Sequence, residues 1–212
     1  MRWWPRFRGI GVSTEARLHA IAERRWVVLD VETSGLDPSR DALLSIGAVA
    51  VRDARIDVDD SFEILVRPAR TSARDNILVH GIGEGAQRDG TDPAAACQAF
   101  LDWAGDAPLV AFHASFDRTV LARAIRAHLA ARPPSDWLDL AGLAPALNPG
   151  VRARALDDWL AHFGLPVEGR HHASADAFAT AMLFLRLLAQ VPAADREPRA
   201  LRRLAGSARW AG

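Results

Sequence analysis

Lysine is absent from the 212 residues, so all 26 positive charges are arginine, and they balance 26 acidic residues. Arginine can bind phosphate through two parallel hydrogen bonds. However, a chain-wide lack of lysine is typical of genome composition, and we infer no function from it. A protein that grips long duplex through its net charge is usually basic. Because the net charge is zero, any nucleic-acid contact must be local or bridged by metal ions.

Cysteine is nearly absent as well, since Cys97 is the only one. No disulfide can form within the chain, which fits a reducing compartment and predicts a cytoplasmic protein. Cys97 lies in a helix-like stretch of small residues. We interpret it as a buried structural thiol, because a nucleophilic cysteine would need a base partner that the sequence does not assign.

Long apolar runs and several common motifs are also missing. No run reaches membrane-spanning length, so we expect no membrane partner. The charged segment Met1–Arg6 is not followed by the apolar core of a signal peptide. The sequence also offers no Cys/His zinc cluster, no P-loop and no Gly-x-Ser-x-Gly elbow.

Half of the residues are hydrophobic, which is enough for one well-formed core. There is no internal repeat and no long linker. We expect an N-terminal extension over residues 1–25, one domain over residues 26–190, and a polar, loosely ordered tail over residues 191–212.

The hydrophobic pattern predicts an α/β fold. Trp26–Leu29 is a short apolar run, as expected of a strand buried on both faces. Leu43–Val51 and the alternating segment Phe62–Val66 are further strand candidates. Beyond them the expected elements are a helix over 93–104, a strand over 109–112, a helix over 116–130, a strand over 137–140, and helices over 155–163 and 173–189. Three strands followed by alternating helices and strands predict one domain with a mixed sheet.

Two acids follow the first strand. Asp30 and Glu32 are two residues apart and share a face if the strand continues. Adjacent carboxylates repel each other, and burial raises that cost. A bound divalent cation such as Mg²⁺ or Mn²⁺, which prefers oxygen ligands, would offset it. An isolated Asp-x-Glu is more often a solvated strand end.

Asp176 is the only charge between Ala173 and Leu185. A carboxylate on a buried helix needs a partner or a metal ion, although an acid in the first turn also favours the helix dipole. Asp117 lies at a strand-to-helix junction, where the same dipole effect is the simpler explanation. His171 and His172 precede the Asp176 helix, and a loop histidine can be a general base or an ordinary surface residue.

Read together and in order, these segments resemble the DnaQ-like, or DEDD, superfamily of 3′–5′ exonucleases. The three motifs are Val28–Leu36, Phe112–Asp117 and His171–Asp176. The third matches the pattern His-x-x-x-x-Asp, which selects His171 over His172 and places the chain in the His-containing branch. Val79–Ile82 resembles the substrate-contacting His-Gly-Ile loop of the family. Within the superfamily the chain is similar to the proofreading epsilon subunits of replicative polymerases.

The resemblance implies a ribonuclease H-like fold and a site for two divalent cations, Mg²⁺ or Mn²⁺. The ligands would be the four acids Asp30, Glu32, Asp117 and Asp176, and His171 would take the proton of the attacking water. The residues expected to contact the terminal nucleotide are Thr33, Ser34, Leu36, His80 and Phe116.

The resemblance also implies a substrate: the 3′ end of a nucleic acid, with single-stranded DNA favoured and nucleoside 5′-monophosphates as products. A DNA polymerase or a repair protein would be a partner. RNA-trimming relatives share the motifs, so an exoribonuclease is the alternative, and a non-catalytic binding or scaffold module is a further one. One departure is visible, because Phe112-His113-Ala114 stands where much of the family has His-Asn-Ala. It leaves Asp117 in place.

Overall fold

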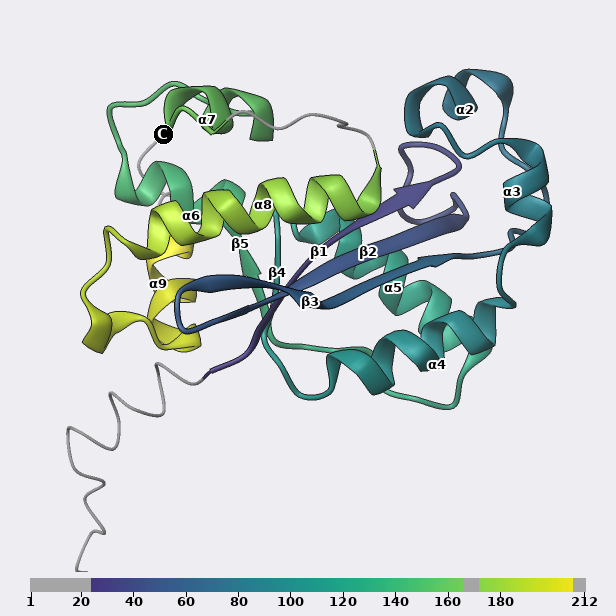
Figure 1. Cartoon of the computed structure of the whole chain (residues 1–212), viewed down its shortest axis with the longest axis horizontal. Helices are drawn as coiled ribbons and strands as arrows, with labels where there is room; N and C mark the ends of the chain where they lie inside the picture. The colour runs from purple at the N-terminus through teal and green to yellow at the C-terminus, as the bar shows by residue number, and fades with distance from the viewer. Residues whose placement is uncertain (1–23, 166–171, 208–212) are drawn as a thin grey trace, which may run out of the picture.

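A computed structural model describes residues 24–165 and 172–207. Its centre is a five-stranded sheet in the order β3-β2-β1-β4-β5 (Figure 1). The first three strands, β1 (Trp26–Thr33), β2 (Leu43–Arg52) and β3 (Arg55–Leu65), pair antiparallel. The short strands β4 (Leu109–Ala111) and β5 (Trp137–Asp139) run parallel to β1. The predicted mixed sheet of three antiparallel strands followed by parallel ones is confirmed.

Strand β1 lies at the middle of the sheet, with side chains alternating between two hydrophobic cores. Trp26 and Val28 belong to one core, whereas Val27, Leu29 and Val31 belong to the other. Its first four residues are buried, as the continuous apolar run predicts. The alternation therefore decides which face of the sheet receives Asp30 and Glu32.

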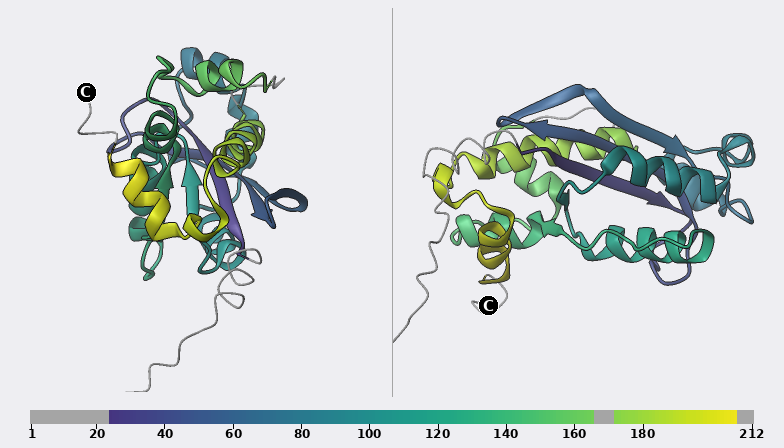
Figure 2. Two further views of the ribbon diagram at one scale, coloured as in Figure 1. Left: turned by 90° about the vertical axis from the view of Figure 1, so that its left-hand side faces the viewer. Right: turned by 90° about the horizontal axis from the view of Figure 1, so that it is seen from below.

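Helices cover both faces of the sheet (Figures 1 and 2). On one face α8 (Ala173–Leu188) packs across β1 and β2, together with α6 (Leu140–Leu147), α7 (Leu156–His162) and α9 (Pro198–Ser207). On the other face lie α4 (Pro93–Ala104) and α5 (Ser115–His128). Among the residues that the structure describes, no helix has the length and apolar character needed to cross a membrane.

Helices α2 (Arg74–His80) and α3 (Glu84–Asp89) lie beyond the end of β1 (Figure 1). The hydrophobic pattern did not predict them, nor did it predict α6. Strand β3 begins at Arg55 rather than near Phe62, because its first half is an exposed, charged edge. The other predicted helices and strands occur within a few residues of their expected bounds.

The expectation of a loosely ordered tail is wrong for residues 198–207. They form α9, which packs on α6 and fully buries Leu201. A Cβ at Gly142 would lie 2.7 Å from the carbonyl oxygen of Ala205, so the two helices approach closely only because residue 142 is glycine. A short 3₁₀ helix, η1 (Ala193–Asp195), precedes α9. Residues 1–23 of the expected extension lie outside the described part, and the domain boundaries stay predictions.

Candidate active site

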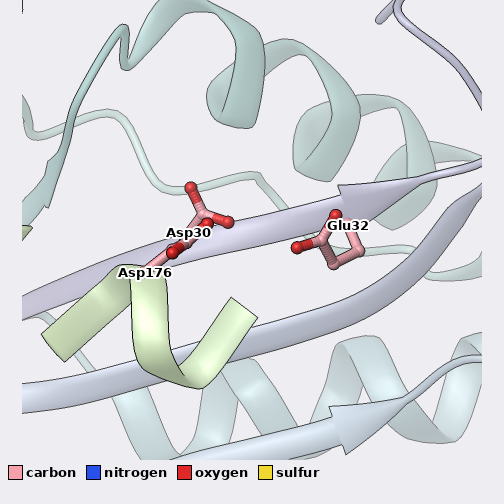
Figure 3. Close-up of side chains that lie close together, drawn as sticks. All are labelled: Asp30, Glu32 and Asp176. Carbon is pink, nitrogen blue, oxygen red and sulfur yellow. The ribbon is translucent and has the colours of Figure 1, made fainter. Parts of the chain in front are cut away.

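Three carboxylates from two elements meet above the sheet. Asp30 and Glu32 extend from β1 and Asp176 from the first turn of α8 (Figure 3). One oxygen of each lies within 4.8 Å of the others. The two acids of β1 share a face because side chains alternate along a strand. The structure thus brings together three of the four acids that the sequence singles out.

Gly47 of β2 determines how closely α8 approaches the sheet. It pairs with Asp30 across the β1–β2 ladder. A Cβ at this position would lie 2.2 Å from the carbonyl carbon of Ala173 and 2.2 Å from the amide nitrogen of Ser174. Because those atoms are backbone, any side chain would displace the start of α8 and move Asp176 away from Asp30. A glycine inside a strand is the usual signal of such an approach, and the sequence reasoning missed it.

Asp176 combines both explanations that its sequence context allows. It occupies the first turn of α8, where the helix dipole favours a negative charge, and its amide donates to the carbonyl of His172 at 2.9 Å. It is also buried, in a helix whose other charged residue, Arg186, lies in the last turn, and it belongs to the acid group. The dipole and a bound cation would act on the same carboxylate in the same direction.

Asp117 lies beside this group without belonging to it. It is buried in the first turn of α5, which follows the end of β4. Burial raises its pKa, the backbone amides of Asp117 and Val31 lower it, and the charges of Asp139 and Glu32 raise it further. The net result is a pKa of about 7. The charge of Glu32 acts on Asp117, so Asp117 lies near the acid group. Asp139 was not among the residues predicted from the sequence. It caps α6 by accepting from the Ala141 amide at 3.0 Å.

The donor set fits a hard divalent cation. All three members of the group offer carboxylate oxygens, the ligands that Mg²⁺ and Mn²⁺ prefer. Three like charges this close repel one another, so a cation between them removes an electrostatic cost as well as gaining ligands. A zinc site would more often include histidine or cysteine.

The loop that follows β1 is fixed by its own side chains. The Thr33 hydroxyl donates to the Gly35 carbonyl at 2.6 Å, and Ser34 Oγ accepts from the Ala42 amide at 2.9 Å. The side-chain amide of Asn76, on α2, donates to the Ser34 carbonyl. Leu36 is 92% exposed at the turn of this loop. The loop therefore presents an apolar side chain to solvent, and the substrate roles of Thr33, Ser34 and Leu36 stay predictions.

The other predicted substrate contacts are less accessible. His80 is buried, and both of its ring nitrogens face partners within the protein. Burial lowers its pKa, and the charge of His172 lowers it further. Phe116 is partly buried and packs against the core beneath α4 and α5. The predicted base, His171, lies outside the described residues.

An α/β fold with a group of three carboxylates on its central strand and a neighbouring helix could hold a metal ion, and sequence comparison identifies the chain as a member of a nuclease family. The model of the Exonuclease family RNase_T matches residues 27–184. The chain belongs to this exonuclease family, which lies in the DEDD exonuclease superfamily. The resemblance drawn from the three motifs is confirmed.

The relatives and structural neighbours agree with this assignment. The chain is 32% identical over 184 residues to the DNA polymerase III PolC-type of Bacillus subtilis (strain 168). The aligned segment covers 85% of this chain and 12% of that polymerase. It is 31% identical to the corresponding polymerase of Thermotoga petrophila, again over 12% of that protein. The chain therefore spans about an eighth of the length of these relatives.

Two solved structures share the ribonuclease H-like fold. E. coli Exonuclease I in complex with a dT13 oligonucleotide superposes with a TM-score of 0.65 at 19% identity, covering 77% of this chain and 41% of that one. Exonuclease X in complex with 5′ overhanging duplex DNA superposes with a TM-score of 0.65 at 24% identity, covering 86% and 99%. At these identities the comparison establishes the fold alone.

Proposed function

We propose that the protein is a 3′–5′ exonuclease that hydrolyses the terminal phosphodiester bond of a nucleic-acid strand and releases nucleoside 5′-monophosphates. The observation that carries the proposal is the gathering of Asp30, Glu32 and Asp176 within 4.8 Å on the face that α8 covers. Membership of the exonuclease family supports the reaction class.

Asp30, Glu32, Asp117 and Asp176 would hold two divalent cations, Mg²⁺ or Mn²⁺. When bound, the cations supply positive charge for the scissile phosphate and for the charge that develops during in-line displacement. The acids alone would repel that phosphate, so their role is to hold the cations beside it. His171 would accept the proton of the attacking water, which forms the new bond to phosphorus as the bond to the 3′ oxygen breaks.

Single-stranded DNA is the substrate we favour. The exposed Leu36 side chain gives an unpaired terminal base an apolar surface at the end of β1. The neighbours bound to dT13 and to 5′ overhanging duplex DNA, and the PolC-type relatives, support DNA as the polymer and a polymerase or repair setting. A cytoplasmic location, expected from the single cysteine, stays a prediction.

The test is cleavage of matched 5′-labelled single strands of DNA and RNA, with Mg²⁺, Mn²⁺ or chelator, by the full chain and by Asp176→Asn. A ladder shortened from the 3′ end, dependent on the metal and lost in the variant, is the expected result. Faster cleavage of RNA would replace the DNA substrate with the exoribonuclease alternative. Cleavage that persists in chelator, or no cleavage of either polymer, would contradict the proposal.

A further inference from the structure

A buried polar network holds the loop between α2 and α3. The Gln87 side chain accepts from the Ser72 amide at 2.8 Å and donates to Ser72 Oγ at 2.7 Å and to the Ile82 carbonyl at 2.8 Å. His80 Nδ1 accepts from the Ile82 amide at 3.0 Å. Its proton therefore resides on Nε2, which faces Ser72 Oγ at 3.4 Å. Because these groups are buried and hydrogen-bonded to one another, the network holds the loop in one conformation on its buried side.

The outer side of the same loop is in contact with His172. Gly81 ends α2 with a φ of 71°, and its amide donates to the Ile77 carbonyl. A Cβ on Gly81 would lie 3.1 Å from Cε1 and 3.7 Å from Nε2 of His172. The imidazole of His172, itself exposed, therefore lies beside Gly81, where an added Cβ would make a tight contact with its edge.

His172 is also tied to the acid group through its backbone. It is the residue before α8, and its carbonyl accepts from the amide of Asp176 at 2.9 Å. It directly follows His171 in the sequence. One residue thus links the start of the helix that carries Asp176 to the loop that follows α2.

We propose that His172 is a positioning residue that braces the start of α8 against Gly81 and so fixes the distance between α8 and the loop that follows α2. The effect of the brace on the reaction rests on the proposed nuclease function, whereas the contact between His172 and Gly81 does not. Its working part is the flat ring in contact with Gly81, and no proton transfer by His172 is involved. Loss of the ring removes a contact between the loop and the start of α8, so that α8 can shift relative to the loop and misplace groups that must act together.

Three variants separate bracing from chemistry: His172→Ala removes the ring, His172→Phe keeps a flat ring without nitrogen, and His128→Ala removes an exposed histidine at the far end of α5. We expect His172→Ala to lower kcat about threefold to tenfold with little change in KM or in the pH profile. His172→Phe is expected to restore most of the rate, and His128→Ala to match wild type. A wild-type rate in His172→Ala would overturn the brace. If His172→Phe were as slow as His172→Ala and the pH profile lost its basic dependence, His172 would be the base instead.

Hydrogen exchange tests the brace without reference to activity. In His172→Ala the amides of Gly81 and Ile82 should exchange faster, since the loop loses its outer support, while amides in the centre of β1 stay protected. In addition, Gly81→Ala should destabilise the fold less in the His172→Ala background than in wild type, because the added methyl then meets no ring. Unchanged exchange or strictly additive effects would contradict the contact. A protein with no nuclease activity would defeat the proposed function, yet these two measurements would still decide the brace.

Discussion

Replacing Gly47 by alanine tests how the acid group is assembled. The added Cβ would lie 2.2 Å from two backbone atoms at the start of α8 and 2.5 Å from the Ala173 carbonyl oxygen, whereas real Cβ contacts essentially never fall below 3.0 Å. Backbone on both sides leaves no flexible group to yield, so α8 must shift by about 1 Å. The overpacking should cost about 1–3 kcal/mol in the free energy of unfolding.

The shift of α8 should also reduce metal binding and catalysis. Asp176 moves with α8 while Asp30 stays on β1, so the ligand oxygens now within 4.8 Å separate. A misplacement of about 1 Å at a catalytic group can lower the rate by about 10²-fold. We expect Gly47→Ala to remain folded, to bind Mn²⁺ much more weakly by titration calorimetry, and to cleave a labelled oligonucleotide about 10²-fold more slowly.

The matched control is Gly85→Ala. Gly85 lies within α3, and a Cβ there would meet no atom within 4 Å. Alanine is favoured over glycine in a helix, so this variant should melt at the same temperature or slightly higher, with unchanged Mn²⁺ affinity. If Gly47→Ala bound Mn²⁺ and cleaved DNA like Gly85→Ala, the contact between Gly47 and α8 would not be what places Asp176.

Four other outcomes follow from the same structure. The pKa of Asp117 is raised to about 7, so in chelator the free energy of unfolding of wild type falls as pH rises from about 4 to 7. In urea titrations Asp117→Asn should therefore be more stable relative to wild type at pH 8 than at pH 4. Hydrogen bonds from Arg25 lower the pKa of Asp60 to about 2 despite partial burial. Asp60→Asn should therefore lower the free energy of unfolding by about 1–3 kcal/mol at pH 7. The difference from wild type should disappear as pH falls from about 4 through 2. His171→Ala should lower kcat by about 10²–10⁴ with Mn²⁺ affinity retained, far more than His172→Ala; equal kinetic effects would refute the choice of base. Deleting residues 1–12 should leave cleavage of short oligonucleotides nearly unchanged, and a large rise in KM, strongest at low salt, would instead show that the Trp- and Arg-rich segment binds the strand.

Much of the sheet and the acid group could be predicted because each depends on local pattern. The apolar run at Trp26–Leu29 requires a strand buried on both faces, and alternation along it places Asp30 and Glu32 together. Asp176 is the only charge between Ala173 and Leu185, which fits either a metal site or the helix dipole, and only the family resemblance favoured the site.

The elements that escaped prediction are held by contacts distant in sequence. Helices α2 and α3 are short; α2 exposes Leu78 and Val79 and α3 is mostly polar, so neither has the buried apolar face that marks a helix. Their loop is fixed by hydrogen bonds between Ser72 and Gln87, a pair that no local pattern reveals. The burial of His80 follows from this network, and a motif match alone could not show it.

Charge effects across the fold were equally out of reach. The sequence places Asp117 at a helix start, where the dipole would favour ionisation. Its raised pKa comes from burial and from Asp139 and Glu32, which only the packing of α5 beside β1 brings near. The start of β3 was missed because Asp60 and its neighbours are polar, and Asp60 is held there by Arg25 and Arg52 from other strands or their flanks.

A thermal melt of wild type and Asp30→Asn, each in chelator and in excess Mn²⁺, tests most directly whether the clustered acids form a cation site. The substitution removes one of the mutually repelling charges and keeps the shape, so in chelator the variant should melt at the same temperature as wild type or higher. At about a hundred times the dissociation constant, Mn²⁺ should stabilise wild type by about 2.7 kcal/mol and the variant by little. If Asp30→Asn is strongly destabilised in chelator, Asp30 is a structural residue held by protein hydrogen bonds. If the variant gains as much as wild type from Mn²⁺, Asp30 is not a ligand of the cation. Either result contradicts the metal-site account.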